Sequence, residues 1–160
     1  MEYEALVTKP KGAITATIEY NDGRESECFC RKNVVLRSGR EALAKMLANE
    51  IGDSFEFFIS RMIFGDSGTN GGVPKFVNTA RSGLFGTTRV NKPVASNIDV
   101  EIPSQVVFTS VISFQEGNGY TLNEMALVMD NGDLYSMATF PDLSKTSAMQ
   151  ITWNWRLSFV

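Results

Sequence analysis

The C-terminal stretch 149–159 alternates apolar and polar residues more regularly than any other part of the chain. Its odd positions are all apolar, and they are Met149, Ile151, Trp153, Trp155, Leu157 and Phe159. Successive side chains of a β-strand point to opposite faces, so this pattern predicts a strand with one apolar and one polar face. Buried aromatic side chains cover roughly 150–250 Å² each, so we expect a second layer of structure over this strand.

Two turn signals predict β-hairpins elsewhere in the chain. Residues 13–20 alternate in the same way and meet Asn21-Asp22-Gly23, after which residues 25–31 form the return strand. The sequence Asp130-Asn131-Gly132-Asp133 separates two further apolar stretches, 124–129 and 134–140. Glycine after Asp or Asn accepts the positive φ that tight hairpin turns require. We therefore expect a hairpin over 13–31, preceded by an irregular N-terminal arm over 1–12.

A single helix is predicted over about residues 39–51. Ser38 and Glu41 have the spacing of a capping box, and apolar residues follow at helical spacing up to Ile51. Gly52 is placed to end this helix with a positive φ. The stretch 55–64 is densely apolar, and 104–114 is apolar on both faces, which is typical of a strand inside a sheet.

These elements predict a mainly β fold. Seven or eight strands with no βαβ alternation favour an antiparallel β-sandwich or a flattened barrel, with one short α-helix. A chain of 160 residues can bury about 70% of its unfolded surface, which suits a single domain over residues 1–160. Residues 65–97 are rich in glycine and contain no long apolar run, so we expect a long loop there.

The charge distribution makes this loop the candidate functional region. Residues 67–98 contain no Asp or Glu, so their Lys and Arg residues make this segment positively charged. The whole chain, by contrast, has a formal net charge of −3. The acidic surface of an identical subunit is therefore a better partner than nucleic acid, which favours basic proteins over one with a pI of about 5.0. We expect the loop to be too rich in glycine to order itself, and to bind a neighbouring subunit through Lys75, Phe76, Arg81, Leu84, Phe85, Arg89 and Lys92.

Residues that could carry catalysis are sparse in the sequence. The chain has no histidine, which removes the commonest general base and the Ser/His and Cys/His systems. Asp66-Ser67-Gly68-Thr69 matches an aspartic-protease signature, but such enzymes need two aspartates, which one copy supplies only in a homodimer. We interpret this motif as a turn, and we interpret the scattered carboxylates as solvated surface charges, namely Glu56, Asp99, Glu116 and Glu124.

We therefore predict that the protein is not an enzyme and has no cofactor or metal. A small hydrolase of the aspartic or glycosidic type is the alternative. Cys28 and Cys30 are two residues apart on one strand face and are expected to be reduced, with a cross-link or metal between subunits as the alternative. The sequence has neither a membrane-spanning run nor a signal-peptide pattern at residues 1–10, so we expect no membrane partner and synthesis in the cytoplasm.

The order of several segments over about residues 33–160 resembles small structural proteins of tailed bacteriophages, of the tail, baseplate, collar and fibre-attachment type. The segments are KNVVLRSGREALAKML, FISRMIFGDSGT, ARSGLFGTTRVNKPV, VVFTSVISF, GYTLNEMALVMDNGDLYSMATFPDLSKT and QITWNWRLSFV. The resemblance implies a virion component, assembled in the host cytoplasm, that associates with itself and with other virion proteins. A carbohydrate- or receptor-binding module on a phage fibre is the alternative function.

Overall fold

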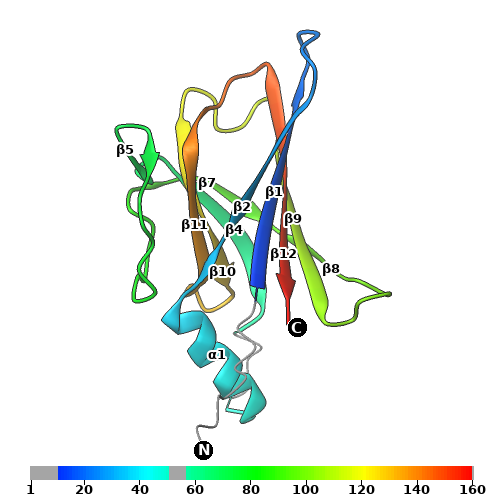
Figure 1. Ribbon diagram of the computed structural model, residues 1–160, viewed down its shortest axis with the longest axis vertical. Coiled ribbons are helices and arrows are strands. Elements are labelled where there is room, and N and C mark those ends of the chain that lie inside the picture. The colour runs from blue at the N-terminus through cyan, green and yellow to red at the C-terminus, as the bar shows by residue number, and fades with distance from the viewer. Residues whose placement is uncertain (1–10, 51–56, 160) are drawn as a thin grey trace, which may run out of the picture.

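Two antiparallel five-stranded sheets pack face to face in this computed structural model, which describes residues 11–50 and 57–159 (Figure 1). The first sheet has the order β2-β1-β12-β9-β8, with β1 Lys11–Tyr20, β2 Glu27–Lys32, β8 Ala95–Ile98, β9 Gln105–Ile112 and β12 Met149–Ser158. The second sheet has the order β3-β11-β10-β4-β7, with β3 Val34–Val35, β4 Ile59–Gly65, β7 Thr88–Pro93, β10 Thr121–Met129 and β11 Leu134–Ser144.

The C-terminal strand β12 lies at the centre of the first sheet, between β1 and β9. Trp153 and Trp155 are both 0% exposed, and the ring of Trp153 lies 5.1 Å from Phe64 of the second sheet and 5.2 Å from Phe140. The predicted core face is thus confirmed up to Leu157. Phe159 is 43% exposed, so its predicted place in the core is wrong, because it lies beyond Ser158, the last residue of β12.

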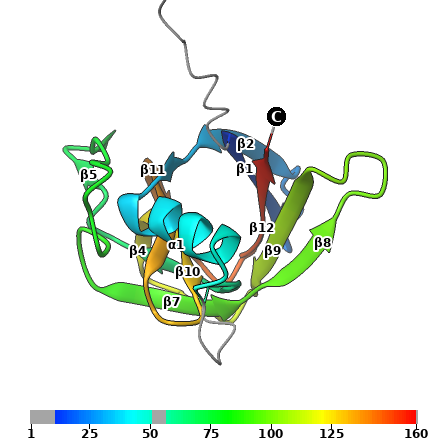
Figure 2. The same cartoon turned by 90° about the horizontal axis from the view of Figure 1, so that it is seen from below.

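The predicted fold class is confirmed, and of the two predicted architectures the structure has the sandwich. Strands β1 and β2 pair antiparallel across a turn that contains Gly23 at φ 88°. Strands β10 and β11 pair across a turn that contains Gly132 at φ 92°. Strand β9 lies inside the first sheet, as its two apolar faces indicated. Figure 2 shows the sheets from the end at which the helix lies.

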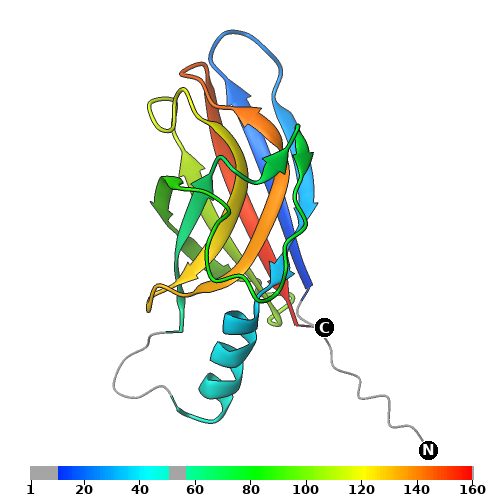
Figure 3. The same cartoon turned by 90° about the vertical axis from the view of Figure 1, so that its left-hand side faces the viewer.

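Helix α1, Arg37–Leu47, begins and ends earlier than predicted. Its N-cap residue is Leu36, which is buried and makes no side-chain capping bond, whereas Ser38 lies inside the helix and its hydroxyl donates to the carbonyl of Leu134. The capping-box prediction is therefore wrong, because β3 leads directly into the helix and leaves no room for a polar cap. The helix lies at one end of the sandwich and not across a sheet face (Figures 1 and 3). The predicted end at Gly52 falls outside the described residues.

The glycine-rich segment is a loop only over residues 66–87, which is shorter than the predicted 65–97. Most of its remaining residues form β7 at the edge of the second sheet and β8 at the edge of the first, while Gly65 ends β4. Val90 of β7 is 7% exposed and belongs to the main core. Short edge strands with polar outward positions have little periodicity, so the sequence pattern did not reveal them.

Candidate functional site

The loop 66–87 covers the outer face of the second sheet. It brings a second apolar cluster together, whose buried members are Leu36, Val77, Ala126, Val128, Leu134 and Met137. Leu84 and Phe85 of the loop pack against this cluster from outside. Strand β10 is consequently buried on both faces over Leu122–Met129. In Figure 3 the green loop passes in front of the orange strands, so the second sheet has a third layer over it.

Glu124 of β10 holds the loop in place. Its side chain is 0% exposed, and its carboxylate accepts hydrogen bonds from three backbone N–H groups of the loop. Oε1 accepts from Gly86 at 3.0 Å and from Ser67 at 3.2 Å, and Oε2 accepts from Phe85 at 2.6 Å. A buried carboxylate needs such donors, because an unpaired buried charge is strongly destabilising. The two ends of the loop are therefore joined through one side chain.

The neighbouring residue, Asn123, fixes the start of the loop. Its Oδ1 accepts from the Gly68 N–H at 2.6 Å, and its Nδ2 donates to Asp142 Oδ1 at 3.0 Å and to Thr69 Oγ1 at 3.1 Å. The Thr69 hydroxyl also donates to Asp142 Oδ1 at 2.7 Å. The bonds from Asn123 and Thr69 lower the pKa of Asp142 below its ordinary value. Asn123 is 3% exposed whereas Asp142 is exposed, so this network connects the interior to the surface.

Two glycines permit this close approach. A Cβ at Gly65 would lie 2.5 Å from Glu124 Oε1, and a Cβ at Gly68 would lie 2.4 Å from the backbone carbonyl oxygen of Asn123. Neither position has space for a side chain. The two glycines of the segment FGDSGT therefore allow its backbone to pack directly against the segment NEMAL of β10.

The sequence interpretation of the carboxylates is corrected by this geometry. Glu124 is not a solvated surface charge but the internal acceptor of the loop. Glu116 accepts a hydrogen bond from Lys92 at 2.7 Å, which is the main cause of its lowered pKa. Asp99 accepts from the N–H groups of Glu101 and Ile102 within a turn. Glu56 lies outside the described residues. Sequence spacing cannot reveal Glu124, whose partners are 38, 39 and 57 residues away.

The predicted basic residues of the assembly loop mostly find partners in their own chain. Arg89 pairs with Asp66 at 2.8 Å, and Lys92 pairs with Glu116. Arg81 lies 3.7 Å from the ring centroid of Phe85 and donates to the carbonyls of Gly83 and Leu84. The expectation that the loop lacks an order of its own is wrong, because buried acceptors of β10 satisfy its backbone.

One part of the loop is nevertheless exposed and apolar. The two-residue turn Gly71-Gly72, with φ 58° and 80°, joins β5 (Thr69–Asn70) to β6 (Val73–Pro74) in a short hairpin. Val73 is 67% exposed and Phe76 is 85% exposed. The backbone immediately before Phe76 is held, because the Lys75 N–H donates to the Gly68 carbonyl and the Lys75 carbonyl accepts from the Thr139 hydroxyl at 2.7 Å. We call Val73–Phe76 the apolar ridge. Of the predicted loop residues, the structure brings Lys75, Arg81 and Phe85 together.

An apolar pocket of about 410 Å³ lies at the helix end of the sandwich. It is lined almost wholly by apolar side chains, among them Met46, Phe58, Ile98 and Phe159. Burial raises the pKa of Tyr135, another lining residue, to about 12. A sugar needs several polar partners as well as aromatic rings, so this lining does not favour carbohydrate binding.

Other candidate chemistry is sparse in the described part of the chain. Residues 11–50 and 57–159 contain no group of three or more Cys, Asp or Glu side chains placed to hold a metal ion. Asp66, of the protease-like motif, is engaged by Arg89. Cys28 and Cys30 are free thiols exposed on β2. None of the described helices is both long and apolar enough to cross a membrane.

The fold and this site define an antiparallel β-sandwich domain that carries a loop fixed by buried hydrogen bonds to the outside of one sheet. The family described as phage tail-collar fibre protein, N-terminal, matches residues 34–156, and the chain belongs to that family. It is thus a structural protein of the phage tail-fibre type and a component of the virion, which confirms the resemblance inferred from the sequence. No curated protein and no solved structure showed a significant match.

Proposed function

We propose that this protein is a non-enzymatic subunit of the tail-fibre apparatus that works by association, both with itself and with other tail proteins, through the apolar ridge Val73–Phe76. One observation carries the proposal: Phe76 is 85% exposed on a loop whose backbone is held by buried hydrogen bonds. A large aromatic side chain displayed on an ordered segment is typical of an interface anchor.

The rigidity of the loop favours binding. A segment that orders only when it binds loses about 1–2 kcal/mol of backbone conformational entropy per residue. The loop 66–87 is already ordered in the subunit through Asn123 and Glu124, so most of that loss is avoided on association. The structure thus supports a docking surface that is formed before its partner arrives.

The charge near the ridge indicates the kind of partner. Among the described residues, the ion pairs include Arg89 and Lys92 but neither Lys75 nor Arg81. These two cations lie over the ring of Phe85, and Lys75 is itself a residue of the ridge. A partner surface with an apolar pocket and an acidic rim fits this arrangement, and the acidic body of an identical subunit is one such surface. Nucleic acid is not the proposed partner.

The role of the ridge in self-association can be tested with the substitution Phe76→Ser. Self-association is measured by sedimentation velocity over a range of concentrations. We expect at least a tenfold weaker association, because an exposed aromatic anchor is worth more than about 1.4 kcal/mol in binding. Val100→Ser is the matched control, since Val100 is 92% exposed and follows β8, at the edge of the other sheet. Unchanged association of the Phe76→Ser variant would show that the ridge is not the interface.

The absence of enzymatic activity has its own test. Asp66→Asn removes the carboxylate of the protease-like motif and weakens a partly exposed pair with Arg89. We expect a loss of about 1 kcal/mol or less in unfolding free energy and no change in association. Pepstatin-sensitive peptide cleavage by the unsubstituted protein, lost in the variant, would overturn the proposal.

A further inference from the structure

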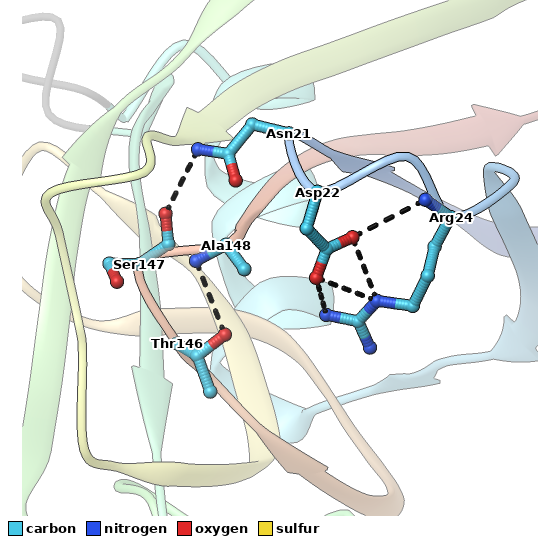
Figure 4. A network of polar contacts seen from close by, with 6 residues as sticks. All are labelled: Asn21, Asp22, Arg24, Thr146, Ser147 and Ala148. Carbon is cyan, nitrogen blue, oxygen red and sulfur yellow. Dashed lines mark hydrogen bonds and ion pairs between the residues drawn. The ribbon is translucent and has the colours of Figure 1, made fainter.

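The two ends of the sandwich are closed in different ways. At the end far from the helix, the Asn21 side chain in the β1–β2 turn donates to the carbonyl of Ser147 (Figure 4), and the Asn21 backbone N–H donates to the carbonyl of Ala148. Asp22 and Arg24 pair at 2.8 Å in the same turn. Polar contacts therefore join the loops at that end, whereas the end at which α1 lies contains the apolar pocket.

That pocket is open to solvent although its walls are apolar. Four of its lining residues are large hydrophobics with exposed fractions between 43% and 62%, namely Met46 of α1, Phe58 before β4, Ile98 of β8 and Phe159 after β12. Contiguous exposed apolar surface is uncommon on a folded domain and usually marks a binding site. A cavity of about 410 Å³ has room for more than one large apolar side chain.

The polypeptide enters the fold beside this pocket. Lys11 begins β1 and pairs with Ser158 of β12, and the residue after Ser158 is Phe159, which lines the pocket. Adjacent strands are about 4.8 Å apart, so the rim of the pocket lies roughly 5–10 Å from the start of β1. Figures 1 and 3 show β1 starting at the end of the sandwich at which α1 lies. The residues that precede Lys11 are therefore joined to the fold at the rim of the pocket.

Those residues have a sequence that suits an apolar pocket. They are MEYEALVTKP, which lie outside the described part of the chain and include the apolar run Ala5, Leu6 and Val7 as well as Tyr3. An extended residue spans about 3.3 Å, so the five steps from Leu6 to Lys11 can cover roughly 17 Å. That length exceeds the distance from β1 to the rim of the pocket, so the apolar run can reach the pocket of its own chain.

The charges beside the pocket also match this segment. The ammonium group of Lys45 lies 5.8 Å from the ring centroid of Phe57, another lining residue. Lys45 takes part in none of the ion pairs between described residues. Glu2 and Glu4 flank Tyr3 in the sequence, so their carboxylates can approach Lys45 when the apolar side chains of the segment enter the pocket.

We propose that residues 3–7 bind in the apolar pocket of their own chain, between α1 and the ends of β8 and β12. A segment attached by a short linker is present at an effective concentration in the mM range, so contacts that would be weak between separate molecules suffice to fill the pocket. The bound segment covers the exposed lining side chains and connects the start of β1 to α1 and β4. The ridge Val73–Phe76 lines no part of this pocket and stays available for association with other subunits.

Cleavage of the whole protein by chymotrypsin after Tyr3 or Leu6, followed by mass spectrometry, measures whether the segment is bound. Ile98→Asp places a charge in the pocket on an edge strand, where Ile98 is 62% exposed. Because cleavage follows the unbound fraction of the segment, we expect these cuts to become at least about fivefold faster. Val111→Asp is the matched control, since Val111 is 37% exposed on β9 outside the pocket, and its cleavage rate should equal that of the unsubstituted protein. Equal rates for Ile98→Asp and the unsubstituted protein would overturn the proposal.

Disulfide trapping identifies which chain supplies the segment. In a C28S/C30S background, Leu6→Cys is combined either with Met46→Cys in the pocket or with Lys32→Cys, which lies beside the start of β1 on β2 but outside the pocket. We expect the first pair to form a disulfide within one chain, seen as loss of both thiols in a monomer on denaturing electrophoresis, and the second pair to stay reduced. Linked dimers from the first pair would assign the pocket to the segment of a neighbouring copy. That result, or equal trapping of both pairs, would contradict the proposed binding within one chain.

Discussion

Replacing Glu124 with glutamine should release the loop 66–87 from the second sheet. The exchange keeps the size of the side chain and changes one carboxylate oxygen into an NH₂ group. The amide oxygen can still accept from Ser67 and Gly86, which share Oε1. The new NH₂ group then faces the N–H of Phe85, which now bonds to Oε2 at 2.6 Å. Two donors cannot bond to each other, so one backbone N–H is left buried without an acceptor.

The size of the effect follows from these contacts. A hydrogen bond to a charged group contributes about 1.5–3 kcal/mol, and an unsatisfied buried donor costs about 1–3 kcal/mol. We expect the free energy of loop opening to fall by roughly 2–4 kcal/mol. In a domain of this size, a loss of about 1 kcal/mol in unfolding free energy lowers the melting temperature by roughly 2–4 °C. If loop and core unfold together, we therefore expect the melting temperature to fall by about 5–15 °C.

Limited proteolysis with trypsin measures the loop directly, because Lys75 and Arg81 lie within it. Cleavage there follows the population of the open loop, so the rate should rise at least about 30-fold in Glu124→Gln. Glu101→Gln is the control, since Glu101 is exposed and its side chain makes none of the described hydrogen bonds. Equal cleavage rates and melting temperatures for the unsubstituted and Glu124→Gln proteins would refute the role assigned to Glu124.

Three further predictions concern the core, the loop and pH. Trp153→Asp should leave an unpaired charge among packed aromatic rings and cost several kcal/mol, so a urea midpoint equal to that of the unsubstituted protein would contradict the core assignment. Gly68→Ala should raise tryptic cleavage of the loop because its Cβ meets a backbone carbonyl, whereas Gly83→Ala, with nothing within 4 Å, should not. The lowered pKa of Asp142 means that its bonds, chiefly those from Asn123, stabilise the fold fully above about pH 4 and are lost as pH falls below it. Unfolding free energy measured from pH 3 to 7 should therefore change less steeply at the acid end in Asp142→Asn, and identical slopes would argue against this linkage.

Local sequence was sufficient to predict the strands and turns that depend on neighbouring residues. The alternation over 149–157 specifies which face of β12 is buried, since the side-chain period of a strand is two. Gly23 and Gly132 have positive φ, as their hairpin turns required. The resemblance to phage structural proteins also came from sequence, through segments that the structure shows in contact: FGDSGT, SGLFGT and NEMAL.

The site depended on contacts that no local pattern contains. Glu124 looks like any surface carboxylate in the sequence, and only the packing of β10 beneath the loop makes it a buried acceptor for Ser67, Phe85 and Gly86. Because of the same packing, the loop that was expected to be unordered is a fixed layer. Leu84 and Phe85, predicted to contact a neighbouring subunit, instead pack against the second apolar cluster of their own chain.

Sequence alone thus determined the long strands, their buried faces and the family, because periodicity and turn conformation are set by residues next to each other in the chain. Tertiary structure decided the start of α1, the edge strands β7 and β8, the order within the loop and which of its side chains remain exposed. Those features depend on hydrogen bonds and packing between segments tens of residues apart, whose partners are defined only when both sheets are in place.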